Sequence, residues 1–192
     1  MKAIILYLFL FLSAQSFSQD NAQGNAWRYR SFSINPILGY YSDFNGNTFG
    51  KAVESYKDFN DTGITIGADV TFSYLEKHLL TLSLYSGTEF NILGTSNGID
   101  QINLFYGRMI PISRTVFFEA HLGAGYFRFN SRHIDNESRR QISKSTIGFP
   151  IMTKFRVMTG KRFSLGVIAQ INFNSIKSFY NVGLILQWNK KR

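Results

Sequence analysis

One stretch of the chain alternates between apolar and polar residues, and this alternation limits the folds that it can adopt. In the stretch Gly63–Leu75, every second residue from Ile64 to Tyr74 is apolar or aromatic, and the residues between these are small or polar. The apolar set is Ile64, Ile66, Ala68, Val70, Phe72 and Tyr74. A period of two places successive side chains on opposite faces of a β-strand, whereas a helix has a period of 3.6 residues. The stretch predicts a strand with one apolar and one polar face.

The same pattern recurs along the chain. With the first stretch included, the predicted strands are Ser31–Tyr41, Gly63–Leu75, Leu79–Ile92, Gln101–Pro111, Val116–Phe129, Thr146–Met158, Arg162–Asn174 and Ser178–Trp188. Most are longer than the ordinary strand of about 5 to 6 residues, and they reach the ~9 to 11 residues that a tilted strand needs to cross a membrane. Short connections alternate with longer ones, as in outer-membrane barrels. We expect an all-β fold, an eight-stranded antiparallel up-and-down transmembrane β-barrel.

The N-terminus has the three-part layout of a secretory signal peptide. Lys2 is followed by an apolar run from Ala3 to Leu12 and by the small-residue end Ser16–Phe17–Ser18. We therefore expect residues 1–18 to be a signal peptide and residues 19–192 to form the barrel domain. No stretch approaches the roughly 20 apolar residues of a transmembrane helix. With no cysteine in the chain, neither disulfides nor thiol chemistry is available.

Removal of residues 1–18 takes away one base and no acid, which leaves a net charge of 21 − 1 − 12 = +8. A secreted chain rarely meets nucleic acid, so we expect anionic lipid headgroups rather than nucleic acid to be the partner of this charge.

The composition of the polar face indicates that it lines the barrel interior. It is rich in glycine, serine, threonine and amides, where a solvated exterior would carry many Lys and Glu. Its few charges have both signs, so that pairing can neutralise them when they are buried. The predicted lumen charge network comprises Asp69, Glu89, Glu119, His121, Lys154 and Arg156. The apolar face, with aromatic residues near the strand ends, is expected to contact lipid.

The last predicted strand carries a second signal. Asn181, Gly183, Leu186 and Trp188 follow the spacing polar, any, Gly, any, any, apolar, any, aromatic. This spacing resembles the C-terminal assembly signal of outer-membrane β-barrels. Together with the signal peptide and the strands, the chain resembles the small outer-membrane barrel family that includes the OmpA transmembrane domain and OmpX. The resemblance implies an outer-membrane location, recognition by the barrel-assembly machinery and a monomeric barrel.

Two connections are candidates for display at the cell surface. Ser42–Thr62 is the longest, and Asn130–Ser145 contains more basic than acidic residues. Its basic residues, Arg132, Arg139, Arg140 and Lys144, are predicted to lie where lipopolysaccharide phosphates would be found, and arginine suits bidentate contacts with phosphate.

These features favour a structural or surface-interaction protein of the outer membrane. Eight strands enclose a lumen filled by side chains, whereas water-filled porins need about 16 to 18, so a general porin is not expected. One alternative is a lipid-modifying enzyme, an acyl hydrolase or acyltransferase, that uses the inward residues Glu119 and His121. Another is a soluble lipocalin-like binding barrel. No cofactor or metal is expected, since no pair of histidines has the spacing of metal ligands.

Overall fold

The computed structural model describes residues 27–40, 62–89, 96–135, 138–176 and 178–190. The predicted signal peptide and the connection Ser42–Thr62 lie outside these ranges, apart from Thr62 itself. The strands are β1 (Arg28–Tyr40), β2 (Thr62–Tyr74), β3 (His78–Glu89), β4 (Ser96–Pro111), β5 (Val116–Asp135), β6 (Ser138–Met158), β7 (Phe163–Phe173) and β8 (Phe179–Asn189).

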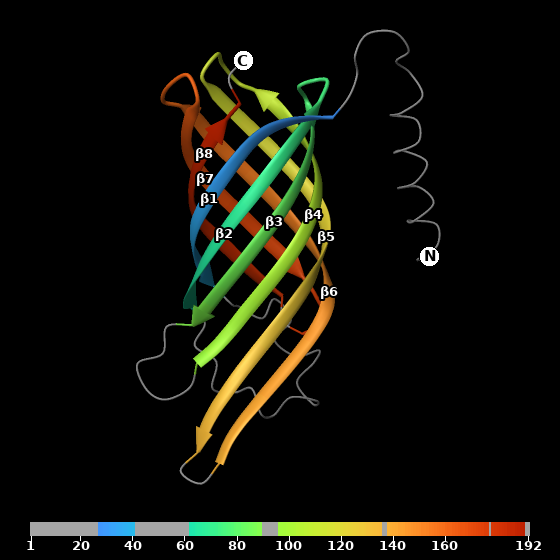
Figure 1. The fold of residues 1–192 in the computed structure, drawn as a ribbon, viewed down its shortest axis with the longest axis vertical. Coiled ribbons are helices and arrows are strands. Elements are labelled where there is room, and N and C mark those ends of the chain that lie inside the picture. The colour runs from blue at the N-terminus through green and yellow to red at the C-terminus, as the bar shows by residue number, and fades with distance from the viewer. Residues whose placement is uncertain (1–26, 41–61, 90–95, 136–137, 177, 191–192) are drawn as a thin grey trace, which may run out of the picture.

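The strands form a closed antiparallel barrel in sequence order (Figure 1). Each strand pairs with the next, and β8 pairs with β1 from Ser31–Asn189 to Tyr40–Tyr180, so the sheet has no long free edge within the barrel wall. The turns after β2, β4 and β6 lie at one end together with the start of β1 and the end of β8. We call this the short-turn end and the opposite one the long-connection end. The predicted fold class is confirmed.

The predicted orientation of the two faces is also observed. In β2, Asp69 is 1% exposed and points into the lumen, whereas its near neighbour Ile66 is 61% exposed on the outside. Outward residues of the other strands are equally open, with Leu38 65% and Ile147 67% exposed. Alternation therefore separates a polar interior from an apolar exterior.

Buried apolar side chains fill the lumen at three levels. Leu79, Met109 and Phe117 pack at the short-turn end, and Ile99, Phe127, Phe129 and Phe179 pack at the long-connection end. The middle cluster is Ile37, Tyr85, Phe105, Met152, Ile168 and Ile185. Tyr85 lies against Gly67, where an added Cβ would overlap the tyrosine ring. The missing side chain at Gly67 therefore lets Tyr85 reach the buried polar groups beside it.

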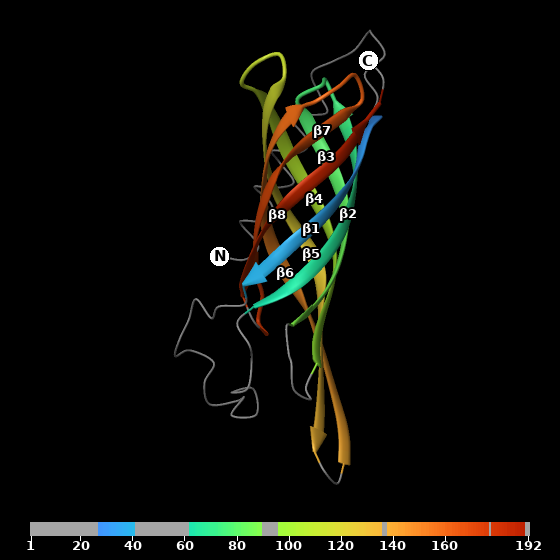
Figure 2. The same cartoon turned by 90° about the vertical axis from the view of Figure 1, so that its left-hand side faces the viewer.

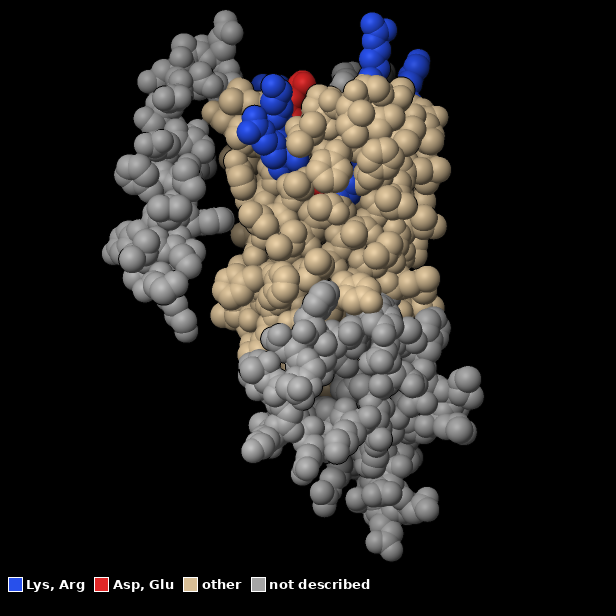
Figure 3. Space-filling model, turned by 180° about the vertical axis from the view of Figure 1, so that it is seen from behind, with Lys and Arg blue, Asp and Glu red and all other residues tan. Residues whose placement is uncertain are grey.

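The exterior carries an apolar belt with aromatic residues toward both ends. Along β5 the outward residues remain apolar from Phe118 to Tyr126, which is 126 − 118 = 8 residue steps, and Arg128 follows. This distance is about 26 Å along the strand and about 20 Å along the barrel axis at a tilt of ~40 to 45°. The belt approaches the ~25 Å apolar band of outer-membrane barrels. Figure 3 shows it as a nearly uncharged surface.

Two predicted boundaries are wrong. β4 begins at Ser96, five residues before the predicted Gln101, and the connection Asn130–Ser145 is misplaced. Asn130–Ser145 is mostly strand rather than loop, because β5 continues to Asp135 and β6 begins at Ser138. Their ladder runs without interruption from Asn130–Ser143 to Asp135–Ser138 and forms a hairpin that projects beyond the other strands (Figures 1 and 2). Beyond the belt neither face of a strand has to be apolar, so the alternation ends there. The backbone ladder between β5 and β6 nevertheless continues.

No helix among the described residues is long and apolar enough to cross a bilayer.

Candidate functional site

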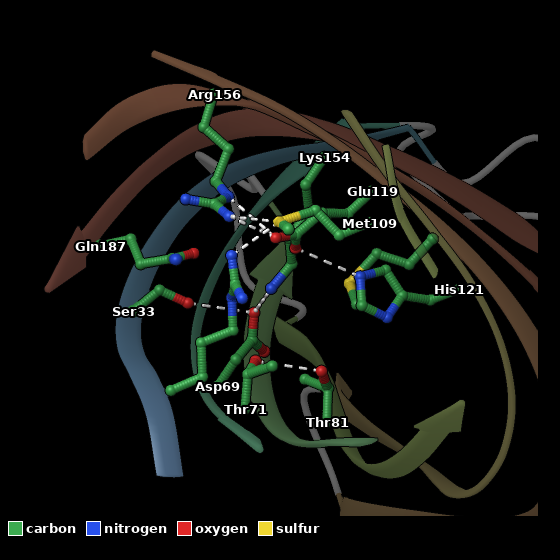
Figure 4. Close-up of polar contacts among 12 residues, drawn as sticks. Ser33, Asp69, Thr71, Thr81, Met109, Glu119, His121, Lys154, Arg156 and Gln187 are labelled. Atoms are coloured by element: carbon green, nitrogen blue, oxygen red, sulfur yellow. Dashed lines mark hydrogen bonds and ion pairs between the residues drawn. The ribbon is translucent and has the colours of Figure 1, made fainter. Parts of the chain in front are cut away.

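The lumen contains two neighbouring ion pairs, and the first joins β2 to β6. Lys154 Nζ lies 2.7 Å from Asp69 Oδ2, and neither side chain is exposed to solvent. Asn35 Nδ2 donates to the same oxygen at 2.7 Å, Ser33 Oγ donates to it at 3.2 Å, and Tyr85 Oη donates to Oδ1 at 3.0 Å. Four donors from three strands, β1, β3 and β6, therefore surround the Asp69 carboxylate. Figure 4 shows two of them, Ser33 and Lys154.

The second pair joins the adjacent strands β5 and β6. Arg156 donates to Glu119 Oε1 through Nε at 3.0 Å and through a second, short contact from its terminal nitrogen. Its other terminal nitrogen donates to Ser164 Oγ at 3.3 Å, and the guanidinium lies 5.3 Å from the centre of the Phe117 ring. His121 Nε2 is 3.4 Å from Glu119 Oε2. Glu119 is therefore held on both carboxylate oxygens.

The structure brings five of the six predicted lumen residues into these two groups, and the side chain of Glu89 lies outside the described residues. The sequence interpretation did not include Tyr85, Ser33, Asn35 or Ser164, although all four lie on inward positions of their strands. The alternation shows which positions face inward, but it does not show which inward side chains contact one another. Among the described residues, no group of three or more His, Asp or Glu side chains is placed to hold a metal ion.

The residues of the predicted assembly signal lie at the closing seam of the barrel. Asn181 is 1% exposed in the lumen, and Gly183 faces inward beside Ile37 of β1. Leu186 and Trp188 face outward, and the Trp188 ring contacts Phe163 at 5.4 Å between centroids and Phe32 at 6.3 Å. The outward part of this pattern therefore lies on the apolar outer face of the barrel.

The basic residues once expected in a loop are distributed over the projecting hairpin. The ladder pairs Arg132 with Gln141, Arg139 with Ile134 and Arg140 with His133, and the side chains of these three arginines lie outside the described residues. Lys144 is exposed and pairs with Phe129.

A further cation, Arg128, lies at the base of the same hairpin. It is exposed, and its Nε donates to Asn130 Oδ1 and Ser143 Oγ at 3.1 Å each. The sequence interpretation did not include it, although it is the first charged outward residue after the apolar belt.

No family model matches the chain, and no curated protein matches it in sequence. Solved structures do match its fold. The attachment invasion locus protein Ail of Yersinia pestis, in complex with the heparin analogue sucrose octasulfate, has 11% identity and a TM-score of 0.59, covering 85% of this chain and 99% of Ail. Neisserial surface protein A has 12% identity and a TM-score of 0.53, covering 88% and 100%. The N-terminal β-barrel domain of Pseudomonas aeruginosa OprF has 13% identity and a TM-score of 0.50, covering 86% and 100%. At these identities the likeness establishes the fold.

Proposed function

We propose that this chain, which has the fold of the small eight-stranded outer-membrane β-barrels, is a monomeric outer-membrane protein that presents the β5–β6 hairpin as an interaction surface. The exposed apolar belt supports the membrane location, because so large an apolar surface is unfavourable in water and favourable in contact with lipid chains. Closure of the barrel also pairs the backbone N–H and C=O groups of every strand, as a bilayer requires. The proposal includes residues 1–18 as the export signal. It also includes Asn181, Gly183, Leu186 and Trp188 as the residues that the barrel-assembly machinery recognises.

The lumen of the proposed protein is closed. Buried side chains occupy its two ends and its middle, and the two ion pairs lie among them. Liposomes that contain the protein should therefore not swell in isotonic solutions of small sugars. Swelling comparable to that produced by a 16-stranded porin would refute the closed lumen.

The observation that carries the proposed function is the length of β5 and β6. The β4–β5 ladder starts at Ser96–Arg132, and the β6–β7 ladder starts at Phe149–Phe173, whereas β5 and β6 continue to Asp135 and Ser138. Residues 138–148 of β6 therefore extend beyond the point where β6 pairs with β7. A paired ribbon holds its position better than a loop of equal length, so it is suited to presenting side chains away from the membrane.

The residue types on this ribbon indicate phosphate groups of lipopolysaccharide as the ligand. Arg132, Arg139 and Arg140 supply guanidinium groups, which match phosphate with two parallel hydrogen bonds, and Lys144 adds a further cation. Ail, which shares the fold, was crystallised with a highly sulfated sugar, and this supports a polyanionic sugar as the ligand class.

The test combines fractionation with a matched pair of variants. The protein should be recovered with outer membranes and should migrate differently on gels before and after heating, whereas recovery in the soluble periplasm would refute the location. In bilayers, a variant with Arg132→Gln, Arg139→Gln and Arg140→Gln should bind lipopolysaccharide at least about tenfold more weakly than the unmodified protein. The control variant, Arg114→Gln, Lys161→Gln and Arg162→Gln, removes the same charge from the short-turn end. An equal loss in the control would refute the hairpin as the site.

We assign Glu119 and His121 a structural role rather than a catalytic one. Both residues are 1% exposed, and Glu119 is already bound by Arg156. An acyl or phosphate ester would have to enter the packed lumen to reach them. The contact between Glu119 and Arg156 links β5 to β6 inside the barrel, which is a structural role.

A further inference from the structure

Basic side chains gather at the short-turn end of the barrel. Seven exposed basic side chains lie at this end. Among the described residues, Glu76 is the exposed acidic side chain there. The cations are Arg28, Lys77, Arg108, Arg114, Lys161, Arg162 and Lys190. The formal charge of this set with Glu76 is 7 − 1 = +6. Figure 3 shows part of this set above the uncharged belt.

These cations are distributed around the whole rim rather than forming one patch. Arg28 and Lys190 come from the two ends of the chain where β1 meets β8, Lys77 from the β2–β3 turn and Arg114 from the β4–β5 turn. Lys161 and Arg162 occupy the β6–β7 turn, and Arg108 lies on the outer face near the end of β4. Because the strands close in sequence order, this set forms a collar, which we call the basic collar.

The aromatic residues next to the basic collar fix its depth in a bilayer. On one side Trp27 contacts Tyr74 at 5.6 Å between ring centroids, and His78 Nδ1 is 2.6 Å from Tyr106 Oη on the outer surface. At the seam itself, Trp188 of β8 contacts Phe32 of β1 and Phe163 of β7. Amphipathic aromatic side chains concentrate at the level of lipid headgroups. The collar therefore lies at the height of the phosphates, where long basic side chains can extend from the apolar surface.

We propose that the basic collar binds anionic phospholipid headgroups of the leaflet at the short-turn end and selects them over zwitterionic lipids. This inference rests on the membrane location given under the proposed function, but it concerns the other end of the barrel and a different lipid. A collar of +6 attracts a net negative headgroup more strongly than a neutral one, and the contact weakens as salt screens it.

The two tryptophans of the chain make this selection measurable. Trp27 and Trp188 both lie at the short-turn end, and the sequence contains no others. Bromine on lipid chains quenches tryptophan fluorescence at short range, so the quenching reports the lipids beside this rim. The probes are dibrominated phosphatidylglycerol and dibrominated phosphatidylcholine with identical acyl chains, each diluted into vesicles that hold the full barrel.

The unmodified protein should prefer phosphatidylglycerol by about fivefold in 50 mM salt, and the preference should fall as salt is raised. A variant with Lys77→Gln, Arg114→Gln, Lys161→Gln and Arg162→Gln changes only exposed turn residues and should show no more than about 1.5-fold preference. A preference below twofold in the unmodified protein, or one that survives in this variant, would overturn the proposal.

A matched pair separates the collar from the overall charge. Lys161→Gln with Arg162→Gln removes two charges beside Phe163 and should lower the preference. Lys144→Gln with Arg128→Gln removes two charges at the other end and should leave it unchanged, so an equal loss in both variants would overturn the proposal. Gel migration before and after heating checks that each variant is folded. If the unmodified chain does not enter bilayers, both proposals fail, whereas insertion without lipid preference refutes the collar alone.

Discussion

Replacing Lys154 with methionine removes the cation from a buried ion pair while nearly keeping the volume of the side chain. Asp69, 1% exposed, then loses the Nζ group at 2.7 Å but keeps the donors of Asn35, Tyr85 and Ser33. Removal of one partner from a buried pair costs about 3 to 5 kcal/mol. Because three hydrogen bonds still reach the carboxylate, we expect the lower end, a loss of about 3 kcal/mol in the free energy of unfolding.

Neutralising the carboxylate tests the cause of this loss. Adding Asp69→Asn to Lys154→Met removes the uncompensated charge, and the double variant should regain about 2 kcal/mol relative to Lys154→Met. Urea unfolding in phospholipid vesicles, followed by tryptophan fluorescence and by gel migration without heating, measures both values. The control is Lys161→Met in an exposed turn, which should stay within about 0.5 kcal/mol of the unmodified protein. The reasoning is refuted if Lys154→Met costs no more than this control, or if the double variant is no more stable than the single one.

Two further predictions concern the lumen and the wall. His121→Ala should leave the lipid A and phospholipid profiles of cells unchanged while lowering the stability of the barrel by about 2 kcal/mol, because it empties a space beside Phe105. An altered lipid profile with a normally folded barrel would support catalysis instead. Gly166→Ala should cost about 1 to 3 kcal/mol, since its Cβ would overlap the carbonyl oxygen of Phe155, whereas Gly160→Ala, with nothing within 4 Å, should cost far less. Similar urea midpoints for the two glycine variants would contradict this.

Much of the barrel wall follows from local patterns. The alternation around Asp69 distinguishes the inside from the outside of β2 because each side chain lies either in the packed lumen or on the apolar outer surface. The same logic fails after Phe129, where β5 and β6 continue into the hairpin. Outside the bilayer both faces of a ribbon tolerate polar residues, so the ladder leaves no periodic signal, and Asn130–Ser145 resembles a loop in the sequence.

The candidate site was only partly predictable for a similar reason. Inward charges of both signs indicate that a pairing must occur, because an isolated buried charge is too costly. The signs of these charges do not indicate which residues form pairs. Tyr85 was not predicted to take part, because an aromatic residue on the inward face is usually interpreted as a packing residue. Its hydroxyl group reaches Asp69 only because Gly67 opposite leaves room for the ring.

The sequence by itself determined the strands, their inner and outer faces and the sign balance of the interior, since each depends on residues that are neighbours along the chain. Only the tertiary structure decided that Asp69 meets Lys154, 85 positions away, and that Glu119 meets Arg156 rather than Lys154. The physical reason is the stagger of a closed barrel. When β8 pairs with β1, the tilt of the strands sets which inward residues lie at the same height, and no short stretch of sequence contains that information.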